Sequence, residues 1–302
     1  MILSHSDYER ERSFSADVVV VGTGAGGAVV GTELAESGRD VLFVEEGSWV
    51  STDAFNPYSS ESIPRLYRDA AATVILGNPP IPYVEGRCVG GSTTINGGMA
   101  YRPPERVLDQ WAKISPDLSA RALEPLFERV EKQVSVGPQL PESIGDDNRV
   151  MTDGARKMGW SYTVNQRNQQ ACVGANNCGF GCPTGAKQST LVTYMPRALA
   201  AGARCLTELK VERLWIEAGR AVGVIARAVC PRTRRAGAEV RVRARAVVVS
   251  CGAVQTPYLL LGHKLGRPSR QLGKNFHCHP NAKVVAIYPH DIQGWRGVSQ
   301  SS

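Results

Sequence analysis

The sequence predicts an α/β fold whose first domain is built on a parallel sheet. Residues 18–21 are four consecutive valines, which is typical of a strand buried on both faces in such a sheet. A helix-like stretch follows over residues 26–36 and ends at Ser37-Gly38, where glycine suits a helix C-cap. Residues 41–44 are again short and apolar, and form the second expected strand. This strand–helix–strand order indicates a Rossmann-like unit.

The turn between the first strand and the helix carries a dinucleotide-binding pattern. Gly22, Gly24 and Gly27 match G-x-G-x-x-G, and Gly26 lies in the same run. Such glycines permit a tight turn and close approach of backbone to a diphosphate, which the helix N-terminus then faces. Glu45, directly after the second strand, is a candidate for binding a ribose hydroxyl. The sequence therefore predicts a dinucleotide site.

A second glycine-rich stretch, GRCVGGSTTINGGMAYRP, covers residues 86–103. Glycine lacks the Cβ that would hold the backbone away from a flat or phosphorylated ligand, while Ser, Thr and Asn supply hydrogen bonds. We expect this stretch to complete the cofactor site. Its candidate cofactor-binding residues are Arg87, Val89, Gly90, Gly91, Ser92, Asn96 and Gly97.

Together, GTGAGG at residues 22–27, VEEG at 44–47 and the 86–103 motif resemble the FAD-dependent glucose–methanol–choline (GMC) oxidoreductase family. The resemblance implies that the first motif holds the ADP half of FAD and that the 86–103 motif surrounds the pyrophosphate and flavin. A later stretch, GAVQTPYLLL at 252–261, is also similar and adds Gly252 and Ala253 to the cofactor-binding candidates. It continues as HKLG, where the family usually has Ser-Gly-aliphatic-Gly.

The resemblance also covers residues 272–280, so that it runs from about residue 15 to the end of the chain. It implies an FAD-binding Rossmann-like domain with three layers (ββα), into which an incomplete α+β substrate domain is inserted. Val211 is expected to contact the adenine through its backbone. The expected segments are 15–111 and 196–280 for the FAD-binding domain, 112–195 for the inserted helical and cysteine-containing region, and 281–302 for the start of a truncated substrate domain.

Residues 48–85 are punctuated by prolines and are expected to form an extended arm over the cofactor. Four further helices are expected, over residues 105–111, from the cap Ser119 onward, over 146–158 and over 189–201. The second of these would place an apolar stripe in the core, formed by Leu123, Leu126, Phe127, Val130 and Val134. From about residue 203 the chain is expected to return to strands.

The net charge of +7 is concentrated in the arginines of residues 227–245. Basic patches can bind nucleic acid, but Arg241, Arg243 and Arg245 alternate with small apolar residues at a period of two. No aromatic side chains lie among them for base stacking. We therefore expect a solvent-exposed hairpin between residues 219 and 247, followed by a strand over 246–250, and no nucleic-acid partner.

Apolar stretches in this chain are too short to suggest a membrane span. The longest without charge, residues 18–32, is interrupted by glycines. The first fifteen residues are charged and lack the apolar segment of a secretory signal, so a cytoplasmic location is expected.

Three of the eight cysteines, Cys172, Cys178 and Cys182, lie within eleven positions among glycines, and a proline follows the last. Such runs can bind iron–sulfur clusters, and some members of the family resembled use a similar spacing in this way. Other members, acting on long-chain or sterol-type alcohols, are similar at residues 178–187 without a cluster. A glycine-rich loop with packed thiols is the favoured interpretation, with an iron–sulfur cluster as the alternative. Zinc would need a fourth ligand, and no histidine lies nearby.

The resemblance implies oxidation of the CH–OH group of a small-molecule alcohol, with hydride transfer to flavin N5 and a possible separate electron acceptor. In that family a histidine near the C-terminus is the base, and none of the five histidines here occupies an equivalent place. The catalytic residues are therefore unknown and expected beyond Ser302, in which case the chain is an N-terminal fragment. A catalytically silent FAD-binding fragment and, less favoured, an NAD-dependent dehydrogenase remain alternatives.

Ile95 occupies the position at which some members of the family carry a histidine bonded to FAD. The resemblance therefore implies FAD held without a covalent bond. Asn96, next in the chain, is the candidate polar contact near the reacting centre.

Overall fold

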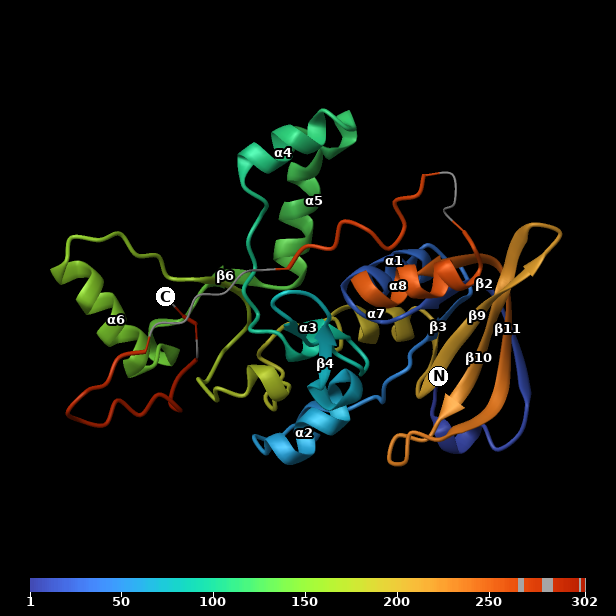
Figure 1. Ribbon diagram of the computed structural model, residues 1–302, viewed down its shortest axis with the longest axis horizontal. Helices are drawn as coiled ribbons and strands as arrows, with labels where there is room; N and C mark the ends of the chain where they lie inside the picture. The colour runs from blue at the N-terminus through green and yellow to red at the C-terminus, as the bar shows by residue number, and fades with distance from the viewer. Residues whose placement is uncertain (266–268, 279–284, 299, 302) are drawn as a thin grey trace. The chain divides into compact units, whose positions relative to one another are not determined.

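The computed structural model describes the chain except residues 266–268, 279–284, 299 and 302 (Figure 1). It divides into two compact units, which are described separately. Unit 1 comprises residues 1–95 and 190–286, and unit 2 comprises residues 96–189 and 287–302. These divisions lie at 95/96, 189/190 and 286/287, whereas the sequence suggested 111/112, 195/196 and 280/281. The assignment of either unit to a cofactor or substrate domain stays a prediction.

A seven-stranded sheet forms the centre of unit 1. Its strands, in spatial order, are β1 (Ile2–Leu3), β8 (Arg204–Leu206), β3 (Val41–Val44), β2 (Arg12–Val21), β11 (Ala236–Val249), β10 (Arg220–Val229) and β9 (Leu209–Glu217). The neighbours from β1 to β11 are parallel, and β11, β10 and β9 pair antiparallel. The predicted α/β fold with a parallel sheet is confirmed.

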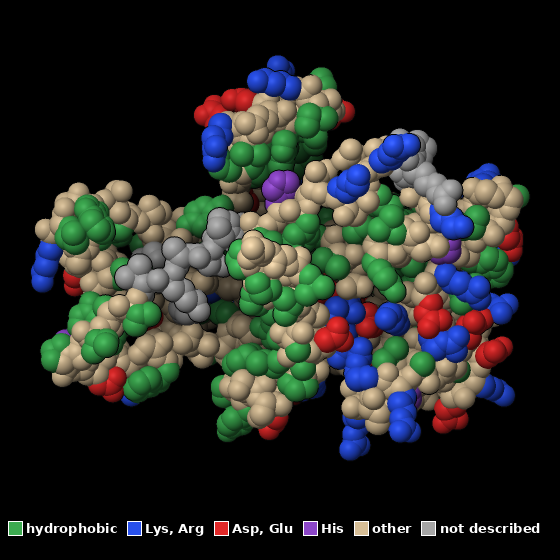
Figure 2. All heavy atoms as spheres, in the orientation of Figure 1, with side chains coloured by type: hydrophobic (Ala, Val, Ile, Leu, Met, Phe, Trp, Pro, Cys, Tyr) green, Lys and Arg blue, Asp and Glu red, His purple; other side chains and the backbone are tan. Residues whose placement is uncertain are grey.

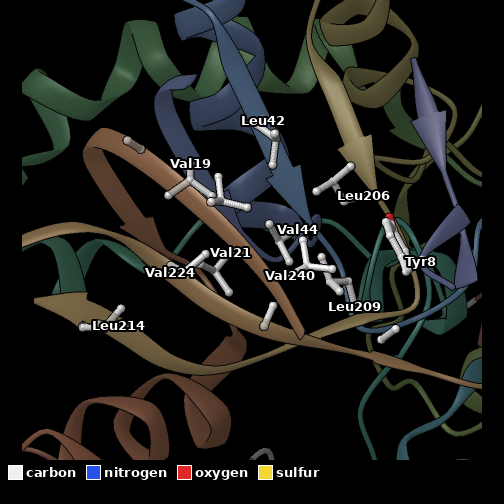
Figure 3. Close-up of a cluster of buried hydrophobic side chains, with 14 of the residues drawn as sticks. Tyr8, Val19, Val21, Leu42, Val44, Leu206, Leu209, Leu214, Val224 and Val240 are labelled. Atoms are coloured by element: carbon white, nitrogen blue, oxygen red, sulfur yellow. The ribbon is translucent and has the colours of Figure 1, made fainter. Parts of the chain in front are cut away.

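Apolar side chains from six of these strands make a continuous core (Figure 3). The valines of β2 lie opposite those of β3, with Val18 level with Val41 and Val21 level with Val44. Val19 and Leu42 have no exposed surface. Because burying one such side chain stabilises a fold by about 1.5–3 kcal/mol, the sheet is the main source of stability in unit 1.

The last strand is longer than expected. β11 continues without a break from Ala236 to Val249, where the sequence suggested a hairpin strand followed by a separate strand over 246–250. The reason is that β11 pairs with β10 over its first half and with β2 from Val240 to Val249.

The alternation along β11 is as predicted, since Val242 and Ala244 are buried and the three arginines of this stretch are exposed. Arg241 pairs with Glu239 at 2.8 Å, Arg243 with Glu217 at 3.0 Å and Arg245 with Asp17 at 3.6 Å. Figure 2 shows acidic and basic side chains interspersed on this side of unit 1.

The helices of unit 1 are α1 (Ala25–Glu36), α2 (Ser59–Leu66), α3 (Ser92–Ile95), α7 (Tyr194–Ala200) and α8 (Gly252–Gly262). α1 ends as predicted at Ser37, before Gly38 with φ of 84°. α7 is shorter than the predicted helix over 189–201. Its start is delayed because Thr190 is held by the glycine-rich loop, with its N–H donating to Thr93 Oγ1 at 3.1 Å.

The expectation of an extended arm over residues 48–85 is wrong. This segment contains α2, the 3₁₀ helices Thr52–Ala54 and Arg68–Ala71, and a hairpin of β4 (Thr73–Ile75) and β5 (Ile81–Tyr83). Pro64 lies inside α2. Asn56 fixes the start of that helix, because its Oδ1 accepts from the Tyr58 N–H at 3.0 Å. The prolines therefore lie within or between short helices and strands and do not prevent their formation.

Unit 2 consists of short elements joined by long connections. Its helices are α4 (Glu105–Ala112), α5 (Ala120–Gln133) and α6 (Asp146–Lys157), as predicted, and its strands are β6 (Val136–Pro138) and β7 (Gln166–Asn168). Single 3₁₀ turns form at Pro116–Leu118, Pro141–Ser143 and Cys178–Phe180. Ser119 caps α5, its Oγ accepting from the Ala122 N–H at 3.3 Å.

The apolar stripe of α5 is not in a core, contrary to expectation. No residue of this helix is buried, and Leu126 and Val130 are 48% and 39% exposed. Among the described elements of unit 2, α4 and the adjoining turn Pro116–Leu118 make the main contacts with α5. These two short elements cover too little of its surface to bury the stripe.

Across the part of the chain that the structure describes, every helix is too short or too polar to cross a membrane. The cytoplasmic location stays a prediction.

Candidate dinucleotide site

A cavity of about 780 Å³ opens in unit 1 where neighbouring parallel strands end. Val21 of β2, Val44 of β3 and Ser250, directly after β11, line it. The carboxyl ends of parallel strands are where open α/β sheets bind their ligands. The volume is within the range of cofactor sites.

The turn after β2 needs its glycines for two different reasons. Gly22 has φ of 96°, and a Cβ there would collide with the Ser250 carbonyl oxygen. A Cβ on Gly27 would collide with the carbonyl oxygen of Gly22, so Gly27 packs against the turn and does not line the cavity. Gly24 differs, because a Cβ built there meets nothing within 4 Å and would project into the cavity.

The N-terminus of α1 opens onto the same space. Gly24 caps the helix, and Ala25 and Gly26 of its first turn line the cavity. The first N–H groups of a helix have no partner within it, and the helix dipole adds partial positive charge at this end. The arrangement suits a negatively charged group.

Glu45 lines the cavity and is buried, with 7% of its surface exposed. Its Oε2 accepts from the Thr23 N–H at 3.0 Å and the Thr23 hydroxyl at 2.7 Å, and its Oε1 accepts from the Gly47 N–H at 2.9 Å. Burial raises the pKa of this carboxyl, and the three hydrogen bonds oppose that effect. Glu45 thus braces the glycine turn in addition to facing the cavity, and its contact with a ribose stays a prediction.

The second glycine-rich stretch reaches the same cavity from a different part of the chain. Gly91 and Ser92 line it, and a Cβ on Gly91 would lie 3.0 Å from the Cα of Gly24. Gly90, with φ of 90°, packs instead against Leu191, and its N–H donates to Thr23 Oγ1 at 3.1 Å. The two stretches therefore meet at the cavity wall.

Four other predicted residues of this stretch do not line the cavity. Arg87 and Val89 are buried in unit 1 behind the wall, with exposures of 5% and 1%. Asn96 and Gly97 belong to unit 2.

The remaining predicted residues lie on other walls of the cavity. Val211 lines it from β9, together with Lys210 and Glu212. Gly252, with φ of 87°, and Ala253 line it from the start of α8.

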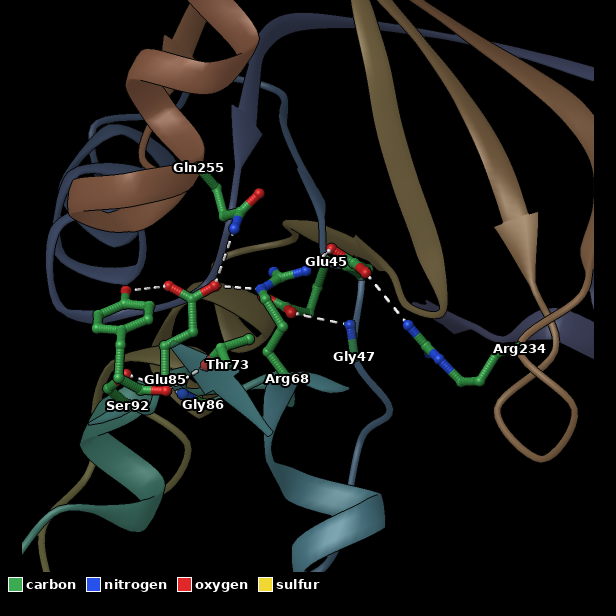
Figure 4. A network of polar contacts seen from close by, with 11 residues as sticks. Glu45, Gly47, Arg68, Thr73, Glu85, Gly86, Ser92, Arg234 and Gln255 are labelled. Carbon is green, nitrogen blue, oxygen red and sulfur yellow. Dashed lines mark hydrogen bonds and ion pairs between the residues drawn. The ribbon is translucent and has the colours of Figure 1, made fainter. Parts of the chain in front are cut away.

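An ion-pair network at the cavity was missed by the sequence analysis (Figure 4). Arg68 bonds to Glu46 at 2.9 Å and to Glu85, and the side chains of all three are largely buried. Its pKa is raised by the two carboxylates, which outweigh the opposing effect of burial. Arg234, from the turn between β10 and β11, adds a second cation on Glu46 at 3.3 Å.

Glu85 extends the network to two further side chains. The Tyr83 hydroxyl donates to its Oε2, and Gln255 of α8 donates to its Oε1 at 3.2 Å. Arg68 was not predicted, because residues 48–85 were expected only to form an extended arm over the cofactor. The available signals were two acids, Glu46 inside VEEG and Glu85 directly before the 86–103 motif.

The three clustered cysteines surround a second, much smaller cavity in unit 2, of about 20 Å³. Burial is the largest effect on Cys178 and raises its pKa, although Lys187 and Arg167 act against it. In Cys182 hydrogen bonds from Thr184 and from the backbone outweigh burial and lower the pKa. Among the described residues, no three His, Cys, Asp or Glu side chains are arranged to hold a metal. The residues present therefore do not fit the iron–sulfur alternative.

None of the described histidines lines the larger cavity. His263 has a structural role, since its Nε2 accepts from the Leu214 N–H at 2.8 Å. His277 Nδ1 lies 2.7 Å from the Asn275 carbonyl oxygen, and His279 lies outside the described residues.

Comparison with known proteins gives the following similarities. Residues 16–281 match the family model described as GMC oxidoreductase. The chain is 36% identical over 284 residues to an uncharacterized GMC-type oxidoreductase of Sinorhizobium fredii, covering 93% of this chain and 55% of that protein. It is 27% identical to a long-chain-alcohol oxidase of Arabidopsis thaliana, covering 90% and 37% of the two chains. The chain thus spans about half the length, or less, of these curated relatives.

Solved structures show the same fold at lower identity. Formate oxidase has a TM-score of 0.59 at 16% identity, covering 83% of this chain and 48% of that one. A variant of the Aspergillus oryzae formate oxidase, determined for the effect of its mutation on FAD modification, has a TM-score of 0.58 at 17% identity and the same coverage.

Proposed function

Because the chain belongs to the GMC oxidoreductase family, we propose that the cavity of unit 1 binds FAD. The chain would then be the flavin-binding part of an enzyme that oxidises the CH–OH group of an alcohol. One observation carries this proposal. Two glycine-rich stretches, 22–27 and 86–103, converge on one cavity, with Gly91 packed against Gly24. A nicotinamide-dependent enzyme has no need of the second stretch.

The residues of the cavity fit the parts of FAD. The open space beside Gly24 and the N-terminus of α1 suit the diphosphate. Glu45 has one lone pair free on Oε1, which can accept from a ribose hydroxyl. The backbone of Val211 would contact the adenine. Backbone groups of Gly22, Gly26, Gly91, Ser92, Gly252 and Ala253 complete the proposed set.

Arg68 supports this function through charge. Four carboxylates line the cavity, those of Glu45, Glu46, Glu85 and Glu212, and a diphosphate would be repelled by unpaired acids. Arg68 neutralises two of them by pairing with Glu46 and Glu85. We propose that it makes the cavity able to accept an anionic cofactor.

FAD when bound supplies the hydride acceptor, at N5 of its flavin ring. The chain's own residues bind and orient it, and Ile95 leaves it without a covalent attachment. Asn96 and Gly97 are proposed to lie beside the flavin. Arg87 and Val89 are proposed to support the loop rather than to touch the cofactor, because both are buried away from the cavity.

The proposed substrate is a small-molecule alcohol, and a separate electron acceptor is a further partner to be tested. A long-chain alcohol is the first substrate to try, because a relative covering 90% of this chain is a long-chain-alcohol oxidase. No described residue is assigned as the catalytic base.

The absorption spectrum of the purified chain, before and after dithionite, tests the proposal. Two flavin bands that bleach on reduction, and that enter the supernatant on acid precipitation, are the expected result. A colourless chain that takes up NADH but not added FAD would contradict it. Flavin that stays oxidised when long-chain alcohols are added without oxygen would indicate an FAD-binding chain without the oxidation chemistry.

A further inference from the structure

The cysteine-rich loop of unit 2 brings three thiols around one small space. Cys172, Cys178 and Cys182 all line the cavity of about 20 Å³, which has room for about one water molecule. All three are free cysteines of intermediate exposure, so a small oxidant can reach them.

Cys178 and Cys182 are the two cysteines that lie in one short turn of this loop. Cys178 begins the single 3₁₀ turn Cys178–Phe180, and Gly181, with φ of 88°, turns the chain just before Cys182. The buried Asn177 side chain closes this loop, its Nδ2 donating to the Gly181 carbonyl oxygen at 2.9 Å. Cys178 and Cys182 are thus four positions apart in one glycine-containing turn, and both line the same small cavity.

Two buried cations connect this pair to the backbone at residues 96–97. Arg167 Nη2 donates to Cys178 Sγ at 3.4 Å and to the Gly97 carbonyl oxygen. Lys187 donates from its backbone N–H to Cys182 Sγ at 3.4 Å, and from Nζ to the Cys178 and Asn96 carbonyl oxygens at 2.6 and 2.7 Å. A change at either sulfur therefore alters the contacts that hold residues 96–97.

We propose that Cys178 and Cys182 form a reversible disulfide when unit 2 meets a peroxide, and that this oxidation loosens the backbone at Asn96 and Gly97. Both S–H bonds and the O–O bond of hydrogen peroxide break, one S–S bond forms, and two water molecules are released. A thiol reductant reverses the change. The disulfide does not depend on FAD binding, so failure of the proposed function would leave it standing.

Peptide mapping of the full chain tests the disulfide. The fully reduced chain is treated with hydrogen peroxide, free thiols are alkylated, and the chain is digested with chymotrypsin, which cleaves after Phe180. We expect one peptide containing Cys178 linked to one containing Cys182, and release of the two by a thiol reductant. Oxidation of either cysteine to a sulfinic acid without linkage, or a linkage through Cys172, would overturn the proposal.

Matched cysteines control the experiment. Cys172→Ser should retain the disulfide, whereas Cys178→Ser and Cys182→Ser should abolish it. Cys230, half-buried in the turn between β10 and β11 with no second cysteine in that turn, should form no internal link in the same sample.

Hydrogen exchange tests the coupling to residues 96–97. Peptides covering residues 96–98 should exchange several-fold faster after oxidation of the native chain, and exchange in Cys182→Ser should not respond to peroxide. Equal exchange in the reduced and the disulfide-linked native chain would contradict the coupling. The native chain is compared with itself, so the result does not depend on whether a variant folds.

Discussion

The two units of this chain are stabilised by different means. In unit 1, apolar side chains from the sheet are buried together, and the largest of them, such as Phe43 and Leu42, have no exposed surface. In unit 2, the longest helix, α5, has no buried residue, whereas charged and polar side chains such as Arg167 and Lys187 are buried and bonded to backbone carbonyls. Hydrophobic burial thus determines the structure of unit 1, and specific polar contacts determine much of unit 2.

Truncating one apolar side chain in each unit should separate the two cases most strongly. Phe43→Ala removes a fully buried ring from β3 and should lower the free energy of unfolding by about 3–5 kcal/mol. Leu126→Ala, on the exposed stripe of α5, should change it by less than about 0.5 kcal/mol. Urea unfolding of both variants measures the difference. Similar losses would show that the stripe of α5 is buried in solution.

The glycine turn of unit 1 should be the next most sensitive feature. Gly22→Ala places a Cβ against the Ser250 carbonyl oxygen at a positive φ, and should cost about 3 kcal/mol. Gly38→Ala is the matched control, because its φ is also positive but nothing lies within 4 Å of its Cβ. It should cost about 1 kcal/mol. Equal midpoints of unfolding for the two variants would refute the close packing of the turn.

A buried cation provides the corresponding test in unit 2. Lys187→Met leaves the carbonyl oxygens of Asn96 and Cys178 without this donor, and should cost about 1–3 kcal/mol. Hydrogen exchange should show the loss in unit 2 while the strands of unit 1 keep their protection. Lys157→Met, at an exposed position, is the control and should leave exchange unchanged. An unaltered exchange pattern in Lys187→Met would argue against stabilisation of unit 2 by its polar contacts.

The smallest effect concerns pH and Glu45. Burial raises the folded-state pKa of this carboxyl above its ordinary value of 4.5, so its ionisation opposes folding. Stability contributed by the neutral group is complete below that value and is lost as the pH rises through the raised pKa. Urea unfolding gives the free energy of unfolding of the native chain and of Glu45→Gln. The native value minus the variant value should therefore decrease as the pH rises from 4.5 to neutral. A difference that does not decrease over this range would mean that the hydrogen bonds from Thr23 and Gly47 outweigh burial.

Sequence reasoning was most accurate where one local rule determines the structure. The valines before Gly22, the helix from Ala25 and the cap at Ser119 are each specified by a few adjacent residues. It was wrong for residues 48–85 and for the α5 stripe. There, the outcome depends on partners distant in the sequence, or on how much neighbouring surface exists to cover a helix.

The candidate site likewise contains residues that the sequence identified and a residue that it did not. Gly22, Gly24, Gly91 and Val211 lie at the cavity, as the motifs suggested. Arg68 could not be identified, because its importance comes from pairing with Glu46 and Glu85, which only the folded chain brings to it. Sequence motifs identify the backbone segments that line the cavity, because their residues have a fixed spacing. The residues of an ion-pair network have no fixed spacing along the chain.

Titration of FAD against the native chain, Gly24→Val and Gly38→Ala, followed by flavin fluorescence, tests the central claim most directly. A Cβ at position 24 has no protein atom within 4 Å, and Gly24 lines the cavity, so we expect Gly24→Val to fold and to occupy part of the cavity. We expect it to bind FAD at least about tenfold more weakly than the native chain, a loss of about 1.4 kcal/mol, while Gly38→Ala binds as the native chain does. Native affinity in a folded Gly24→Val would contradict the placement of FAD in the cavity of unit 1.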